Sequence, residues 1–255
     1  MEKKTKQVTF ETKCYENDWE FLLKAGRLQK MIEYCDYPFE KRVLYINNVS
    51  DLALVKKSAD KCINKNIIDS YVVVEDYAKE TLSHFNLTID SFKGGYYYSI
   101  QELTGIYLCE TEYLLHFSGD TIMRGKSPWI NQALQKLEEN PQFLLANPSW
   151  DKSFAEARAE SFGEDPLFFH SFGFSDHCYL IKTERFRENI YHETHPDSER
   201  YPKYGGELFE KRVDSYLRNR DLYRLTSKTA CFRHRNFPKK KWKRWFWINL
   251  GIKVE

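Results

Sequence analysis

The chain has 255 residues, 42% of them apolar and 16% aromatic, which excludes a disordered chain and suffices for one large folded domain or two small ones. No stretch approaches the ~18 consecutive apolar residues of a membrane-spanning helix. The amino terminus is charged but leads into no apolar segment of the secretory kind, so we expect a cytoplasmic protein.

The basic residues are concentrated at the carboxyl end of the chain. Ten of the 39 Lys and Arg residues, but only one of the 37 Asp and Glu residues, lie within 222–255, so the net charge of +2 conceals an acidic remainder. The six cysteines are scattered and form neither a Cys-x-x-Cys pair nor a zinc-ligand spacing. We therefore expect reduced side chains that pack as small apolar groups.

The first third of the chain alternates predicted strands with predicted helices. Short runs of β-branched and aromatic residues predict the strands, and apolar residues at helical spacing predict the helices. The strands cover 8–13, 42–46 and 71–74, and the helices cover 17–35 and 52–62. Asn17 or Asp18 is the expected cap of the first helix. This order favours a parallel sheet with crossover helices, an architecture typical of nucleotide-binding proteins.

The middle of the chain is predicted to hold a strand that is buried on both faces and ends at a carboxylate. Apolar residues dominate 113–117, and the turn Ser118-Gly119-Asp120 follows. Ligands of open α/β sheets bind where the carboxyl ends of strands meet loops. Asp120 is therefore expected to handle a metal or a phosphate.

Further elements follow on both sides of this strand, and the second half is the less regular one. A helix is expected over 100–109, and another begins with Ser127 as cap and Pro128 at its first helical position. Beyond it we expect a strand over 143–146 closed by a turn over 147–150, an aromatic loop over 168–174, a strand over 178–182, an exposed loop over 192–206, a helix opened by Gly205-Gly206-Glu207, and an extended segment over 222–233 that ends at His234.

The order of these segments resembles a GT-A-type glycosyltransferase of the bacterial, nucleotide-sugar-dependent kind that builds surface polysaccharide. The resemblance rests on Cys14-Tyr15-Glu16-Asn17, Leu44-Tyr45-Ile46-Asn47-Asn48-Val49 with Asp51, the segment 112–120, Phe174-Ser175-Asp176 and Gly205-Gly206-Glu207. It implies an α/β fold with a Rossmann-like, mostly parallel sheet flanked by helices. We expect a single catalytic domain over 1–236, divided into a nucleotide-binding half (1–125) and an acceptor half (126–236), and a basic aromatic tail over 237–255.

In that family the mid-chain strand ends in two carboxylates that hold Mn²⁺ or Mg²⁺ on the donor diphosphate. Here Ser118 occupies the first position and only Asp120 is a carboxylate, so metal dependence is an open question. One carboxylate plus substrate phosphates can hold such a cation. The late His234 is the implied partner on the metal or diphosphate. The alternatives are a turn-capping acid at Asp120 and a surface or capping histidine.

The resemblance also implies a base and a donor-binding set. Glu207 would take the proton of the acceptor hydroxyl and Asp176 would position hydroxyl groups. Alternatively, Glu207 complements a helix amino terminus and Asp176 is a turn residue. The implied contacts to the nucleotide base and ribose come from Asn47, Asn48 and Asp51, with Glu75 and Asp76 after the third strand as further candidates. Ordinary loop chemistry is the alternative for each of them.

The tail over 237–250 combines a basic cluster with tryptophan and phenylalanine. This combination predicts peripheral contact with the anionic inner face of the plasma membrane. A nucleic-acid patch has the same charge signature, but the acidic remainder and the lack of a binding motif argue against it. The remaining alternative is a solvated tail docked by its tryptophans.

The sequence thus predicts a hexosyltransferase-like enzyme of polysaccharide biosynthesis. It would move a sugar from a nucleotide-sugar donor to a hydroxyl of a glycan or lipid-linked glycan, with inversion. Two alternatives are a non-catalytic nucleotide- or glycan-binding protein on the same scaffold and a nucleotidyltransferase, which would be expected to use at least two carboxylates for its metals.

Overall fold

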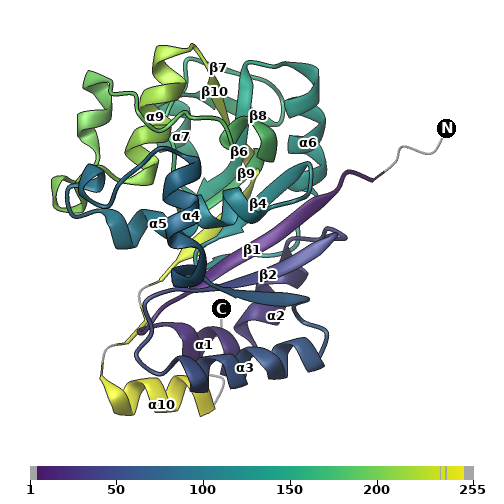
Figure 1. The fold of residues 1–255 in the computed structure, drawn as a ribbon. Coiled ribbons are helices and arrows are strands. Elements are labelled where there is room, and N and C mark those ends of the chain that lie inside the picture. Colours follow the sequence, from purple (N-terminus) through teal and green to yellow (C-terminus); the bar gives the residue numbers. More distant parts are fainter. Residues whose placement is uncertain (1–4, 236, 239, 250–255) are drawn as a thin grey trace.

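The computed structural model describes residues 5–235, 237, 238 and 240–249, so Lys239 and 250–255 of the predicted tail lie outside the described residues. Within the described part, the strands join in one mixed sheet (Figure 1). Their bounds are β1 (Val8–Cys14), β2 (Lys41–Ile46), β3 (Ser70–Val73), β4 (Tyr113–Phe117), β5 (Thr121–Met123), β6 (Phe143–Trp150), β7 (Gly163–Glu164), β8 (Phe168–Ser171), β9 (Cys178–Lys182) and β10 (Tyr223–His234).

The strand order is β3-β2-β1-β4-β9-β6-β10-β8-β7, with β5 paired to β10 outside this path. Pairing is parallel through β3, β2, β1 and β4, whereas β9 is antiparallel to both of its neighbours. β10 is parallel to β6, so it runs in the same direction as β4. The carboxyl ends of β1, β2, β4 and β10 and the start of β9 therefore meet at one edge. The predicted α/β class, with a parallel core flanked by helices, is confirmed.

Two apolar layers cover the two faces of the sheet. One is built with α1 (Trp19–Lys24), α2 (Arg27–Tyr34), α3 (Leu52–Asn64) and α6 (Trp129–Glu139). The other is built with α4 (Val74–His84), α5 (Tyr96–Leu108), α8 (Thr183–Phe186) and α9 (Phe209–Asn219). Along β4, Leu115 packs into the first layer and Leu114 into the second. The prediction of a strand buried on both faces is confirmed.

The remaining helical segments add little to these layers, although the first 3-10 turn places Phe92 in the second one. They are α7 (Phe154–Ala159), α10 (Lys241–Asn249) and the 3-10 turns η1 (Asp90–Phe92), η2 (Pro196–Arg200) and η3 (Lys203–Gly205). In the described part of the chain, no helix combines the length and the apolar character that crossing a bilayer requires. The six cysteines are free, and all but Cys231 are buried.

The prediction of one helix over 17–35 is wrong, because α1 and α2 are separate. The chain breaks at Gly26, whose φ of 72° is a left-handed conformation that glycine adopts without steric cost. Asp18 precedes α1 but does not bond to its amide groups. Its Oδ1 instead accepts a hydrogen bond of 2.8 Å from the Tyr15 amide, which fixes the loop after β1.

Several predicted boundaries in the second half also need correction. The aromatic segment expected to be a loop contains β8, whose Phe168 and Phe169 are both buried and therefore hide the alternation of a strand. β6 does not end at residue 146 but continues through Pro148. A proline is tolerated there because the pairing of β6 with β10 changes register around it. Pro128 is the cap of α6 rather than its first helical residue.

Three acidic candidates lie in slightly different elements from those predicted. Glu75 and Asp76 belong to the first turn of α4, which follows β3 without a loop. Glu207 precedes α9, which begins only at Phe209.

Candidate functional site

Asp120 and His234 meet at the edge of the sheet although 114 residues separate them. Oδ2 of Asp120 lies 2.9 Å from Nε2 of His234. The short strand β5, which sequence reasoning missed, brings them together because Thr121 pairs with His234 in its antiparallel register with β10. The amide of Arg235 also donates to the Asp120 carbonyl at 3.2 Å. Both side chains remain about one-fifth exposed and are open to a ligand.

His177 extends this pair toward Asp176. Its ring stacks on that of His234 with centroids 4.3 Å apart, and its Nδ1 lies 3.0 Å from Oδ1 of Asp176. Burial lowers the pKa of His177, but its hydrogen bond to Asp176 and the nearby negative charges outweigh this and leave the pKa raised. Burial would raise the pKa of Asp176, yet the contact with His177 and the charge of Lys13 hold it well below its usual value. An ionised carboxylate and a readily protonated imidazole therefore stand side by side.

Ser118 has a structural role in this arrangement. Its amide donates to the His177 carbonyl at 2.9 Å, and its hydroxyl donates to the Asp176 carbonyl at 3.0 Å. These bonds tie the turn after β4 to the turn before β9. The serine at the position where the resemblance implies a carboxylate therefore holds Asp176 and His177 in place.

Lys13 and the fully buried Glu102 form a partly buried ion pair near these groups. Lys13 is near the end of β1, and Glu102 projects from α5. Burial lowers the pKa of Lys13, but the negative charges of Glu102, Asp176 and Asp120 outweigh it and raise the pKa. The lysine stays positive and offsets part of the negative charge at the site. Sequence reasoning did not identify it, because its partners come from distant segments.

A fully buried pair of ionisable residues, Glu11 and His116, lies deeper, between the sheet and α5. Nδ1 of His116 is 2.9 Å from Oε1 of Glu11, and the His116 ring stacks on Tyr179. Burial raises the pKa of Glu11 and lowers that of His116, so both favour their neutral forms. Within the described residues, the second oxygen of Glu11 and the Tyr179 hydroxyl have no hydrogen-bond partner. Such atoms are typical sites for internal water.

Two carboxylates near the start of α9 differ in their surroundings. Glu207 lies 3.2 Å from Lys211 and 3.4 Å from Lys93. Burial opposes ionisation, but these lysines outweigh it and lower the pKa of Glu207. Glu210, which sequence reasoning missed, is on the first turn of α9. Burial and the negative charge of Asp176 raise its pKa to about 8. Its only sequence signal was its position three residues after Glu207.

The predicted donor-binding residues of the second loop lie together after β2. The Asn47 side-chain amide donates to the Tyr97 carbonyl at 3.3 Å, and the Asn48 carbonyl accepts from the Glu16 amide at 3.3 Å. The Asp51 carboxylate accepts from the Leu54 amide at 2.9 Å and so caps α3. These residues border the loop after β1 at the same edge of the sheet as Asp120.

Glu75 and Asp76 are exposed on α4. Burial and the nearby charge of Glu75 raise the pKa of Tyr96 at the start of α5. A cavity of about 710 Å³ lies beside the loops after β1 and β2 and is closed on one side by α10. Asn17, Ser50 and Asp51 line it together with Arg244 and Trp245.

The residues at this edge fit a cation that takes most of its ligands from elsewhere. Among the described residues no group of three His, Cys, Asp or Glu side chains converges as a metal site. Asp120 and His234 supply one carboxylate oxygen and one imidazole nitrogen. Mg²⁺ and Mn²⁺ prefer oxygen ligands, and Mg²⁺ is commonly held by one or two carboxylates together with phosphates and water. The pair therefore fits a cation shared with a diphosphate.

Comparison with known proteins gives structural matches only. No family model matches the chain, and no curated protein matches its sequence. Glucosyl-3-phosphoglycerate synthase from Mycobacterium tuberculosis, in complex with Mg²⁺ and uridine diphosphate, aligns over 91% of this chain and 73% of its own, with 12% identity and a TM-score of 0.49. The same enzyme with Mn²⁺, uridine diphosphate and phosphoglyceric acid aligns over 91% and 72%, with 11% identity and a TM-score of 0.49.

A further solved structure, described as a mycobacterial protein, aligns over 92% of this chain and 69% of its own, with 11% identity and a TM-score of 0.47. These structures align with most of this chain, at 11–12% identity. At these identities and TM-scores the likeness assigns no activity, ligand or residue role to this chain.

Proposed function

We propose that the chain is a glycosyltransferase that moves a sugar from a nucleotide-sugar donor to a hydroxyl of a glycan or lipid-linked glycan, with inversion. The observation that carries the proposal is the convergence of Asp120, His234, His177 and Asp176 at the edge where the loops after β1 and β2 also open. A pair suited to a metal and a phosphate, beside an ionised carboxylate and an imidazole, can activate a donor and orient the hydroxyl group of an acceptor.

In this proposal Asp120 and His234 bind a divalent cation on the donor diphosphate. Such a cation supplies positive charge that stabilises the departing diphosphate. Asn47, Asn48 and Asp51 contact the nucleotide, with Glu75 and Asp76 at the outer rim. Lys13 holds positive charge beneath the site and limits repulsion between the donor phosphates and the surrounding carboxylates.

The proton of the acceptor hydroxyl has two candidate receivers. Glu207 is the one that the sequence resemblance implies, but two lysines hold it in its ionised form. Glu210 has a pKa of about 8, so only its ionised form, a minority at neutral pH, can accept a proton, but that form is a stronger base than Glu207. We therefore favour Glu210 as the base, with Asp176 kept ionised to orient hydroxyl groups and Glu207 as the alternative.

Thermal unfolding with nucleoside diphosphates and Mn²⁺ tests the core of this proposal. We expect at least one nucleoside diphosphate to raise the midpoint of wild-type unfolding by several degrees only when Mn²⁺ is present, because ligand binding stabilises the folded state. Asp120→Asn should abolish the Mn²⁺-dependent part of the shift. The matched control Asp60→Asn changes an exposed carboxylate on α3 and should leave it intact. Absence of any stabilising nucleotide would contradict the proposal.

We also propose that α10 attaches the protein to an anionic membrane. Phe21 of α1 stacks on Phe237 at 4.3 Å and contacts Trp247 edge-on, and Arg244 pairs with Glu20 at 3.3 Å, so one side of α10 is docked. The outer side carries Trp242, Trp245 and Phe246, which are 60%, 58% and 43% exposed. Lys240 and Lys243 are exposed beside them. Aromatic rings with adjacent lysines match the chemistry of an anionic lipid interface.

A further inference from the structure

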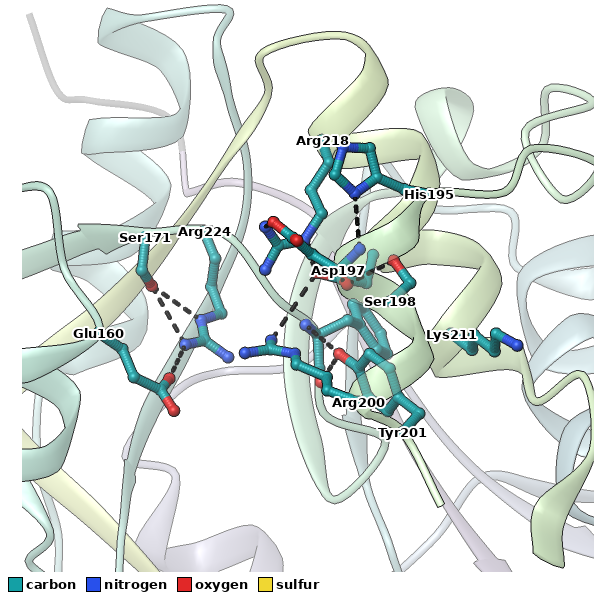
Figure 2. Close-up of polar contacts among 12 residues, drawn as sticks. Glu160, Ser171, His195, Asp197, Ser198, Arg200, Tyr201, Lys211, Arg218 and Arg224 are labelled. Atoms are coloured by element: carbon teal, nitrogen blue, oxygen red, sulfur yellow. Dashed lines mark hydrogen bonds and ion pairs between the residues drawn. The ribbon is translucent and has the colours of Figure 1, made fainter. Parts of the chain in front are cut away.

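Two arginines from distant segments converge on Gly173. A side-chain carbon added to this glycine would collide with Nη2 of Arg200 and lie 3.3 Å from Nη1 of Arg224. Gly173 has a φ of 100°, which L side chains rarely adopt, so its backbone conformation favours glycine. Figure 2 shows the two guanidinium groups pointing toward one another. Like charges held this close favour an anion between them.

Hydrogen bonds from neighbouring residues fix the backbone around Arg200. The Tyr201 hydroxyl donates to the Phe174 carbonyl at 2.8 Å and accepts from the Phe174 amide at 3.0 Å, which fixes the chain after Arg200 against the chain after Gly173. Ser198 in η2 also donates to the buried Asp214 at 2.7 Å. The backbone that carries Arg200 is therefore positioned before any ligand arrives.

Arg224 leaves part of its hydrogen-bonding capacity unused. Its Nε and Nη2 donate to the Ser171 hydroxyl at 3.2 and 3.1 Å, but a single neutral oxygen does not balance its charge. In the described part of the chain, Nη1 makes no hydrogen bond. Burial lowers the pKa of Arg224, and the charge of Arg200 adds to this effect. Arg200 has its nearest carboxylate, Asp214, at 3.8 Å, and that carboxylate is shared with Arg218.

One carboxylate, that of Glu160, already contacts Arg224. Oε2 of Glu160 lies 3.4 Å from Nη2 of Arg224, while the Glu160 side chain is 55% exposed (Figure 2). A long contact from an exposed, flexible side chain is weak and exchanges readily with solvent. Glu160 therefore shows that a carboxylate-sized group can reach the guanidinium, and it can be displaced by a better ligand.

The same arginine lines a cavity that leads to the candidate site. The cavity has a volume of about 270 Å³ and is bordered by Arg224, Ser175, His177 and Phe232, with Glu156 and Glu160 also on its wall. Trp150, which is 53% exposed, stands on its wall. A ligand that reaches His177 with its hydroxyl can thus extend toward Arg224 in the same cavity.

We propose that Arg224 and Arg200 form a subsite for an oxyanion, a phosphate or carboxylate, carried by the acceptor. The inference rests on the proposed glycosyl transfer and names the acceptor class as an anionic glycan or polyol. A guanidinium fork binds such groups through charge-assisted hydrogen bonds in a fixed geometry. The anion binds at the arginines, and the hydroxyl that receives the sugar lies near His177 and Asp176.

Calorimetric titration with inorganic phosphate at constant ionic strength tests the subsite. The full chain, saturated with a nucleoside diphosphate to occupy the donor site, should bind one phosphate. Arg200→Gln, at a side chain that is 42% exposed, should weaken binding about tenfold. Glu160→Gln should strengthen it about threefold because a competing anion is removed. Arg220→Gln removes the same charge from an exposed arginine at the end of α9 and should bind phosphate as the wild type does.

Arg224→Gln should abolish phosphate binding; if this variant fails to fold, Arg200→Gln decides alone. Absence of saturable phosphate binding, or equal affinity in the wild type and Arg200→Gln, would overturn the subsite. A soluble hexose phosphate and a phospholipid in micelles then separate a free acceptor from a lipid-linked one, and Arg200-dependent binding of either supports the subsite. If phosphate does not bind but nucleotides still stabilise the fold, the subsite is wrong and the proposed transfer function stands. If phosphate binds but no nucleotide stabilises the fold, the transfer function is wrong and the anion site stands.

Discussion

At the scale of single residues, the candidate site depends on which carboxylates are ionised. Asp176 is held ionised by His177 and Lys13, whereas Glu210, close to the same group, has a pKa of about 8. Paired titratable groups whose environments separate their pKa values are a common sign of divided acid and base roles. The environment thus gives Asp176 and Glu210 different protonation states near neutral pH although both are acids.

We expect Glu210→Gln to lower sugar transfer by about 100-fold or more, because loss of a general base typically costs this much. Nucleotide binding should be unchanged, since the substitution preserves size and the donor residues lie elsewhere. Steady-state transfer rates, paired with thermal unfolding in the presence of nucleotide, measure both quantities. Glu207→Gln is the matched comparison and should retain most of the rate. The opposite ranking of the two variants would assign the base to Glu207.

At the scale of elements, sequence patterns identified the segments that are continuously apolar and bounded by turn residues. β4 and β9 were predicted within a residue because their apolar runs are continuous and bounded by turns. β5 was missed because it is only three residues long and exists through its pairing with β10. The break at Gly26 was missed because the apolar residues of α1 and α2 keep a nearly common helical spacing.

The candidate site was only partly predictable from the sequence. Asp120 and His234 were singled out by the position of their segments in a resembling family, and the sheet brings them into contact. Lys13, His177 and Glu210 were not singled out, because their pKa values depend on charges and burial that arise only in the fold. The role of Ser118 was equally hidden, since its bonds reach across to another turn.

Helix α10 leads to a prediction about membrane attachment. We expect the double substitution Trp242→Ala and Trp245→Ala to weaken binding to anionic vesicles about tenfold, because two exposed indole rings leave the interface. Cosedimentation at moderate salt measures the effect. Trp150→Ala removes a similarly exposed tryptophan from a different surface and should bind vesicles as the wild type does. Equal binding by the double variant would show that α10 is only a docked surface helix.

At the scale of the whole molecule, buried ionisable groups on the sheet and on the elements packed beside it link protonation to folding. Burial raises the pKa of Glu11 and Asp18, and burial together with Asp176 raises that of Glu210. Such acids bind protons more tightly in the folded state than in the unfolded state. Their contribution to stability is therefore complete at low pH and is lost as pH rises through the folded pKa. His116, whose pKa is lowered by burial, acts in the opposite sense below its ordinary value of 6.5.

Glu210 allows this linkage to be measured. Between its unfolded pKa of 4.5 and its folded value of about 8, the folded state holds a proton that the unfolded state has lost. The free energy of unfolding should therefore fall with rising pH by about 1.4 kcal/mol per pH unit from this group. Glu210→Gln removes the titration, so its stability relative to the wild type should improve steadily across this window.

Urea denaturation of both proteins at pH 5, 6.5 and 8 measures the difference. Glu207→Gln is the control: its folded pKa is lowered below 4.5, so it contributes no titration in this range and should leave the pH dependence of stability as in the wild type. Parallel stability curves for Glu210→Gln and the wild type would mean that Glu210 is ionised in the folded protein. The raised pKa that favours it over Glu207 as the base would then be absent, and the two carboxylates would have to be distinguished by their transfer rates alone.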